Sequence, residues 1–390
     1  MKKRTNSDLS KISLPFSATR AVDKSSVFDM RAAACRKDAG KKGASRREER
    51  LDLLRIMGLL LIIVAHTDPP DWLGQLRNFD VPLMVMISGA VYGLSAGAGD
   101  PEFGSYLRKR IPRLVVPTWT FLFTFFVFSS ILFQLAGKEL PFPPKTMVAS
   151  FLVFSGIGYI WIIRVFLLIA IAAPLFLLLH RRITTNAVFF CILLSIYSLY
   201  ELTYRLYSNA GSSFLAPFFN DFLFYLIPYG CVFALGLRLP SMRKRLVGFL
   251  FLTFFCLFWL LAFASGFEAT QYSKYPPQTY YLSYALSASI FLFIALPKRL
   301  ASYLLSFRLI SFISASTLWI YLWHILFRYC WEWYFPLVPA QLDVFAGRYL
   351  MILSLALAMT YMQKYMIEKI IIRNQLQPAK RKLLELIFLS

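Results

Sequence analysis

The chain has 390 residues, of which 58% are hydrophobic and only 16% are charged. This composition excludes an ordinary soluble domain, which carries more charge and fewer long apolar segments. The formal net charge is +22, but the basic residues lie in the tails and in short loops between apolar segments, where membrane proteins concentrate them. We therefore expect a polytopic membrane protein, and no nucleic-acid partner.

The first 48 residues differ from the rest of the chain. They are polar, rich in Lys, Arg, Ser and Ala, and show no sustained periodicity. They lack the apolar core of a signal peptide, so residues 1–48 are predicted to form a disordered, basic, cytoplasmic arm. Arg46, Arg47 and Arg50 adjoin the first apolar segment and should hold its start on the cytoplasmic side.

Long apolar segments dominate the remainder of the chain. Most of them approach the length of about 20 residues that a membrane-spanning helix needs, and they are too continuous for the strands of an outer-membrane barrel. We therefore predict an all-α polytopic bundle of about ten transmembrane helices. The expected spans are residues 51–66, 79–97, 114–135, 159–179, 185–203, 221–237, 246–265, 279–297, 310–329 and 346–366.

The charges of the short loops give this bundle an orientation. Loops on the side of the N-terminus hold thirteen Lys and Arg residues, against seven in the opposite loops. Because basic loops stay in the cytoplasm, both termini are expected there. Residues 367–390 are basic and apolar by turns, and we expect this amphipathic tail to lie on the inner membrane surface, attracted to anionic lipids.

Arg55 and His66 are the most informative residues of the first span. They are eleven positions apart, so in a helix they share one face, roughly 16 Å apart along the axis. Charged or titratable groups are costly in a bilayer and are tolerated where they face a bundle interior or a wet cavity. Asp52 lies three residues before Arg55 and can neutralise it within the helix. The alternative is that His66 only hydrogen-bonds a neighbour at the membrane interface. If His66 is functional, an acid could orient its imidazole ring, and the candidates are Asp68, Asp71 and Asp80.

A basic segment precedes the third span. Arg110 and Arg113, with Arg108 before them, would form a small anion site at the cytoplasmic mouth of the bundle. Arginine forks suit phosphate oxygens. The alternative is that these residues only enforce the orientation of the membrane helices.

Together these motifs resemble the acyltransferase-3 family of bacterial integral-membrane acyltransferases. The resemblance rests on the Arg-x10-His arrangement of Arg55 and His66, and on the Arg-x-x-Arg of Arg110 and Arg113. It extends over about residues 48–366. The segment 314–324, which ends in Tyr-Leu-Trp-His, is similar to a late Tyr-x-x-His helix of the family, and 274–281 is similar to an outer loop of surface-polysaccharide O-acetyltransferases, including the enterobacterial common antigen type.

The resemblance implies a function for each motif. Residues 49–366 would be the membrane acyltransferase domain, in the bacterial cytoplasmic membrane, and acetyl-CoA would be the donor, reached from the cytoplasm. The histidine that matches His66 is regarded as catalytic in the family. The arginines that match Arg55, Arg110 and Arg113 are regarded as contacts for the donor or its path. The acceptor would be a hydroxyl group of a cell-surface or lipid-linked glycan.

Three further residues are candidates for binding the acceptor. Tyr321 and His324 are three apart in the ninth span, so both can line one cavity, although His324 can equally satisfy a hydrogen bond near the interface. Gln278 follows two prolines in an outer loop whose tyrosines suit either sugar recognition or an interfacial aromatic belt.

These expectations combine into one mechanism. A neutral His66 would take the proton of an acceptor hydroxyl as that oxygen attacks the thioester of acetyl-CoA, and an acetyl-histidine intermediate stays open. The five cysteines show no metal-ligand spacing, so no metal is expected. The alternative function is a transporter or flippase of lipid-linked sugars or small anions, which would also place Arg and His in a membrane cavity. Association into a homo-oligomer is left open.

Overall fold

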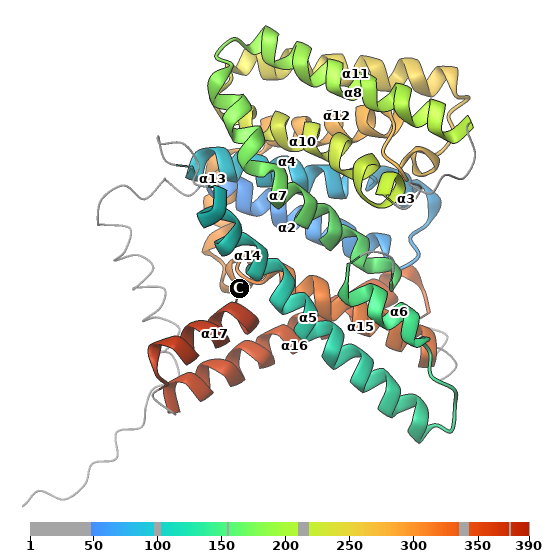
Figure 1. The fold of residues 1–390 in the computed structure, drawn as a ribbon, viewed down its shortest axis with the longest axis vertical. Coiled ribbons are helices and arrows are strands. Elements are labelled where there is room, and N and C mark those ends of the chain that lie inside the picture. Colours follow the sequence, from blue (N-terminus) through green and yellow to red (C-terminus); the bar gives the residue numbers. More distant parts are fainter. Residues whose placement is uncertain are drawn as a thin grey trace, which may run out of the picture. The chain divides into compact units, whose positions relative to one another are not determined.

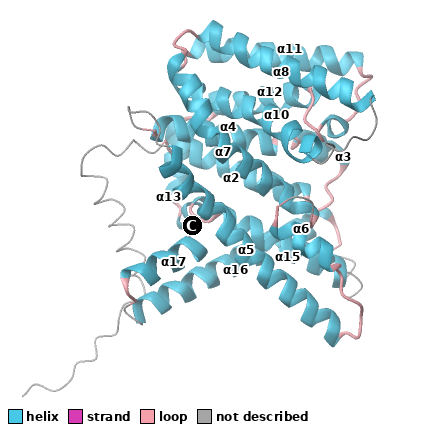
Figure 2. Cartoon of the chain, viewed as in Figure 1, coloured by secondary structure: helices cyan, strands magenta, loops and turns pink. Residues whose placement is uncertain are grey.

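The computed structural model describes residues 48–96, 103–153, 156–209, 218–334, 343–373 and 376–389. Within these ranges all regular secondary structure is helical (Figure 2). The predicted all-α bundle is therefore confirmed. The predicted basic arm, apart from Glu48, lies outside the described residues.

The helices follow one another with short connections (Figure 1). Their bounds are α2 (Glu49–Ala65), α3 (Asp71–Leu76), α4 (Asp80–Ser95), α5 (Phe103–Leu135), α6 (Pro144–Phe151), η2 (Gly158–Ile160), α7 (Trp161–Arg182), α8 (Asn186–Asn209), η3 (Phe219–Leu223), α10 (Phe224–Arg238), η4 (Leu239–Ser241), α11 (Lys244–Ala264), η5 (Thr270–Ser273), α12 (Thr279–Ala295), α13 (Lys298–Ser306), α14 (Arg308–Ser314), α15 (Thr317–Tyr334), α16 (Phe345–Arg373) and α17 (Pro378–Phe388).

Six of these helical segments are long and apolar enough to cross a membrane, and two bent pairs raise the number to eight. The bent pairs are α12 with α13, at 83°, and α14 with α15, at 86°. Each of the ten predicted spans falls on helical residues, the ninth on two helices, but α2 and α4 have only 17 and 16 residues. The count of ten depends on these two short helices and stays a prediction.

The structure differs from the predicted spans most clearly at three places. The ninth span is not one helix over 310–329, because α14 and α15 meet at a sharp bend. Residues 298–306, predicted as a loop, form α13, which begins directly after Pro297 because a proline favours extended backbone before it and fits the start of a helix. α5 begins at Phe103 rather than near residue 114 and contains Pro112 and Pro117.

The short helices α2 and α4 are buried. α8, α11 and α16 are mostly uncovered, with 17% of their most apolar window buried, whereas 67% is buried in the segment that contains α10. α4 packs on α10 through two glycines: a methyl group on Gly89 would lie 2.2 Å from the Phe233 carbonyl oxygen, and one on Gly236 would lie 2.0 Å from that of Met86. Small residues allow this close approach of membrane helices.

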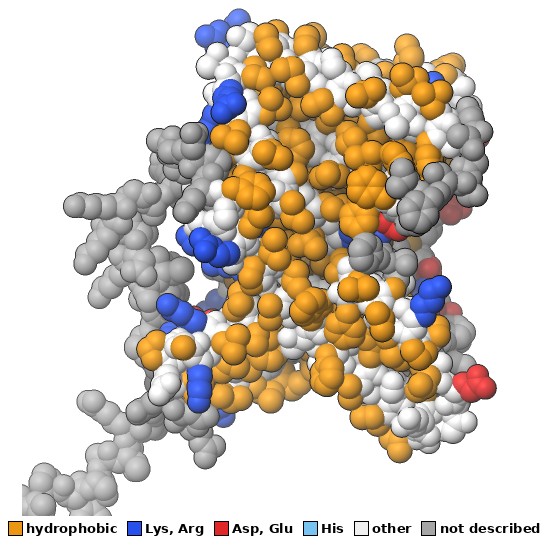
Figure 3. Space-filling model, viewed as in Figure 1, with side chains coloured by type: hydrophobic (Ala, Val, Ile, Leu, Met, Phe, Trp, Pro, Cys, Tyr) orange, Lys and Arg blue, Asp and Glu red, His pale blue; other side chains and the backbone are white. Residues whose placement is uncertain are grey.

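Basic residues gather along one edge of the bundle, the left edge in Figure 3. α2 and α5 both begin near that edge (Figure 1), and the start of α2 is joined to α13 by the ion pair between Glu48 and Lys298 (3.8 Å). This distribution agrees with a cytoplasmic face there. The position of the termini relative to the membrane stays a prediction.

The C-terminal tail packs against the bundle. Its helix α17 contacts α5 and α16. Near its end, the carbonyl oxygen of Ile387 accepts a hydrogen bond from the Trp319 indole (3.1 Å), and the Phe388 ring stacks on the same indole. The tail is helical with Lys380 and Lys382 exposed, and its predicted contact with lipid stays a prediction.

Candidate active site

The helix α2 carries both residues of the Arg-x10-His motif. Arg55 forms an ion pair with Asp52 one turn earlier (Nη1 to Oδ1, 3.2 Å), as the spacing predicts. His66 is the residue that follows the last turn of α2, with φ −97° and ψ 8°. The residue as a whole is half-buried.

His66 contacts His324 of α15. The Nδ1 atom of His66 lies 2.8 Å from the Nε2 atom of His324, and the two ring planes are within 6° of parallel. His324 is completely buried, and its other ring nitrogen, Nδ1, hydrogen-bonds the carbonyl oxygen of Tyr321 one turn earlier. The structure thus joins His66 to Tyr321 and His324, a pair that the sequence nominated together but apart from His66.

Tyr159 and Tyr321 pack against this histidine pair. The ring of Tyr159, in η2, meets the ring of His66 edge to face, with centroids 4.6 Å apart. The Tyr321 hydroxyl donates a hydrogen bond to the backbone carbonyl of Tyr159 and so ties η2 to α15. Sequence reasoning missed Tyr159, because nothing in its own segment distinguishes it from other interfacial tyrosines.

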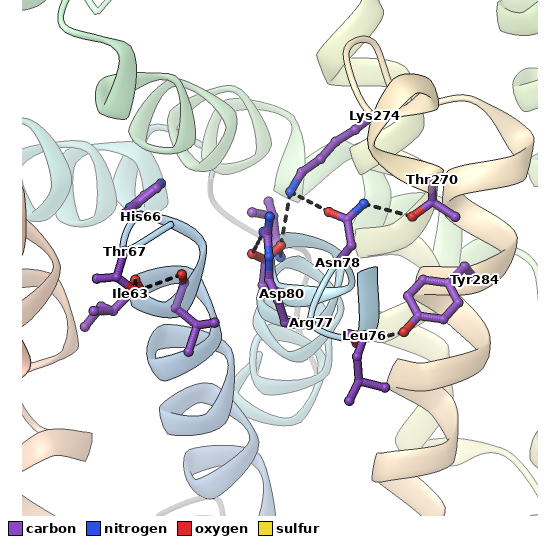
Figure 4. A network of polar contacts seen from close by, with 12 residues as sticks. Ile63, His66, Thr67, Leu76, Arg77, Asn78, Asp80, Thr270, Lys274 and Tyr284 are labelled. Carbon is purple, nitrogen blue, oxygen red and sulfur yellow. Dashed lines mark hydrogen bonds and ion pairs between the residues drawn. The ribbon is translucent and has the colours of Figure 1, made fainter. Parts of the chain in front are cut away.

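A buried polar network lies near His66 (Figure 4). The carboxylate of Asp80, at the start of α4, forms ion pairs with Arg77 (2.8 Å) and Lys274 (3.5 Å). Lys274 also donates to the Asn78 amide oxygen (2.9 Å), and the Asn78 amide nitrogen donates to Thr270 (2.9 Å). Two cations around one carboxylate leave a formal surplus of one positive charge.

This network acts on the histidine electrostatically. Arg77 and Lys274, together with Arg328 of α15, lie close enough to His66 for their charges to act on its ring. Burial lowers the pKa of the Lys274 ammonium below its ordinary value, and the Asp80 carboxylate opposes that shift. Since the charges are buried, solvent screens them little.

Asp68 fixes the loop that follows His66. Its backbone is in the left-handed region (φ 50°). Its carboxylate contacts Arg328 of α15 at 3.3 Å and Arg348 of α16 at 2.5 Å. Of the three acids considered as partners for His66, none hydrogen-bonds it among the described residues; its hydrogen-bond partner there is His324.

The arginines of the predicted donor site lie elsewhere. Arg108, Arg110 and Arg113 are in the first turns of α5 and are exposed. Within the described ranges they form no ion pair, and no contact there joins them to the histidine pair. Gln278 precedes α12 as its N-terminal cap residue, half-buried, and does not contact the histidines either.

Fold and site together define a polytopic helical membrane protein with a titratable pair set among buried cations. Residues 48–362 match the sequence profile of a family described as an acyltransferase domain. The chain therefore belongs to the acyltransferase-3 family and is a membrane acyltransferase. Comparison with curated proteins and with solved structures gave no match.

Proposed function

We propose that the protein is an O-acyltransferase of the bacterial cytoplasmic membrane. It would move acetyl groups from cytoplasmic acetyl-CoA to a hydroxyl of a cell-surface or lipid-linked glycan, with His66 as the general base. The observation that carries the proposal is the position of His66: half-buried at the end of α2 and hydrogen-bonded to the buried His324. Family membership favours this enzyme over the transporter or flippase considered from the sequence.

The reaction needs one base and one site for developing negative charge. His66 takes the proton of the acceptor hydroxyl while its oxygen attacks the thioester carbonyl, and the carbonyl oxygen becomes an oxyanion. Buried cations aimed at such an oxygen stabilise it because water does not screen them. Arg77 and Lys274 carry the surplus positive charge beside His66 and would supply this stabilisation. Collapse of the intermediate forms the acetyl ester and releases CoA.

The donor would bind from the basic edge. Arg108, Arg110 and Arg113 of α5 are exposed and form no ion pair with other described residues, and they suit the phosphates of CoA. Arg55, farther along α2, would contact the pantetheine arm as it runs toward His66. The bundle would then carry the acyl group from one side of the membrane to the other, and only the thioester end of the donor would reach the histidine pair.

The test is release of CoA from labelled acetyl-CoA by the purified protein, assayed with candidate glycan acceptors. We expect turnover to disappear in His66→Ala. His180→Ala is the matched control, because the chain has three histidines and His180 lies at the far end of α7, with its backbone carbonyl bound by Arg238. Turnover that survives unchanged in His66→Ala would overturn the assignment of the base.

A further inference from the structure

The hydrogen bonds of the histidine pair determine where its protons lie. A neutral imidazole has one N–H donor and one acceptor nitrogen. The Nδ1 atom of His324 faces the carbonyl oxygen of Tyr321, which can only accept, so this nitrogen carries the proton. The Nε2 atom of a neutral His324 is then an acceptor.

The position of the proton on His324 determines the position of the proton on His66. The Nε2 atom of His324 lies 2.8 Å from Nδ1 of His66, and a hydrogen bond between them needs one proton. Since His324 accepts, His66 donates from Nδ1, and its own Nε2 keeps a free lone pair. A charged His324 would be the other solution, but His324 is completely buried, and an unpaired buried charge is costly.

We propose that His324 is a positioning residue that holds His66 in the Nδ1–H tautomer through the hydrogen bond that it accepts. This inference rests on the proposed function of His66. The tautomer leaves Nε2 of His66 as the basic atom, on a residue that is half-buried. The pair is therefore prepared for proton removal before any acceptor binds.

The proton movements balance over one cycle. The acceptor O–H bond breaks as the new C–O bond forms, and the proton goes to Nε2 of His66. The proton on Nδ1 of His66 stays there and is donated to Nε2 of His324, so His66 carries the positive charge and the buried His324 stays neutral. When the C–S bond breaks, His66 gives the proton on its Nε2 to the CoA thiolate, so both rings regain their resting state.

Two conservative substitutions separate this role from simple packing. The amide oxygen of His324→Gln reaches the place of Nε2 and can accept from His66, so it preserves the tautomer. The amide of His324→Asn reaches only the place of Nδ1 and leaves His66 without an acceptor. We expect kcat to stay within about 10-fold of wild type in the Gln variant and to fall about 10²–10⁴-fold in the Asn variant, the range for loss of acid–base catalysis, with the KM for acetyl-CoA unchanged. Equal kcat values in the two variants, or a kcat near wild type in the Asn variant, would overturn the proposal.

A second measurement uses the unmodified protein. Nitrogen-15 NMR of histidine-labelled protein distinguishes the two neutral tautomers, and only three histidines contribute. His66→Gln and His180→Gln samples assign the signals. We expect His66 with its proton on Nδ1 and its Nε2 unprotonated, and the reverse tautomer would refute the inference. This outcome does not depend on turnover, so a failure of the proposed acyl transfer remains distinguishable from a failure of the tautomer argument.

Discussion

Substitution of Asp80 tests whether the negative charge of Asp80 stabilises the buried network of Arg77 and Lys274. Asp80→Asn keeps the shape of the side chain and an oxygen that can accept from the Val81 amide, as Asp80 does at 2.7 Å. It removes the single negative charge that Arg77 and Lys274 share. The side chains of Asp80 and Lys274 are each 2% exposed, so water cannot replace the lost partner.

The magnitude follows from what each substitution leaves behind. Breaking a buried ion pair from one side costs about 3–5 kcal/mol, because the remaining charge has no counter-charge. Lys274→Met leaves the Arg77–Asp80 pair intact and orphans only the Asn78 amide oxygen, which costs about 1–3 kcal/mol. We therefore expect the free energy of unfolding to fall more in Asp80→Asn than in Lys274→Met.

The free energies can be measured by unfolding the purified protein in mixed micelles of dodecyl maltoside and SDS. Tryptophan fluorescence reports the transition, since the chain has eight Trp. Asp71→Asn is the control: Asp71 is exposed at the start of α3, so its effect should stay within about 0.5 kcal/mol. If Lys274→Met costs as much as Asp80→Asn or more, the loop contacts of Lys274 stabilise the site and the charge argument is wrong.

Three other substitutions address the remaining features. Gly236→Ala should lower the free energy of unfolding by about 1–3 kcal/mol or more, since its methyl group would collide with the Met86 carbonyl. Its control, Gly248→Ala, has nothing within 4 Å of the added methyl group and should raise the free energy of unfolding by about 0.5–1 kcal/mol. The same micelle titration compares the two variants. Arg113→Ala should raise the KM for acetyl-CoA about 10-fold with kcat unchanged, as loss of uniform binding does, and a kcat defect alone would contradict a donor-binding role. Asp68→Asn should lower kcat, because it releases the loop after His66, while stability changes by less than about 1 kcal/mol for a side chain 60% exposed; a large loss of stability would instead make Asp68 a structural residue.

The sequence predicted the contacts that depend on spacing within one helix. The contact between Asp52 and Arg55 follows from their separation of three, and Tyr321 and His324 share a face for the same reason. It could not predict that His66 pairs with His324, or that Lys274 reaches Asp80. Those partners are 258 and 194 positions apart, and their meeting depends on how several helices pack, which no periodicity records. The bend between α14 and α15 was missed because the residues there, Ser314-Ala-Ser-Thr317, include no glycine or proline to mark it.

The separation of the histidine pair has a consequence for biogenesis. At about 5–20 residues per second, a ribosome needs roughly 13–50 s to synthesise the 258 positions between His66 and His324. During that interval α2, the predicted first span, is present without α15. The ion pair between Asp52 and Arg55 lies within α2 itself, so these two charges can neutralise each other before any later segment arrives. On the proposed role of His324, in contrast, the Nδ1–H tautomer of His66 is selected only when α15 is inserted, late in the synthesis of the chain.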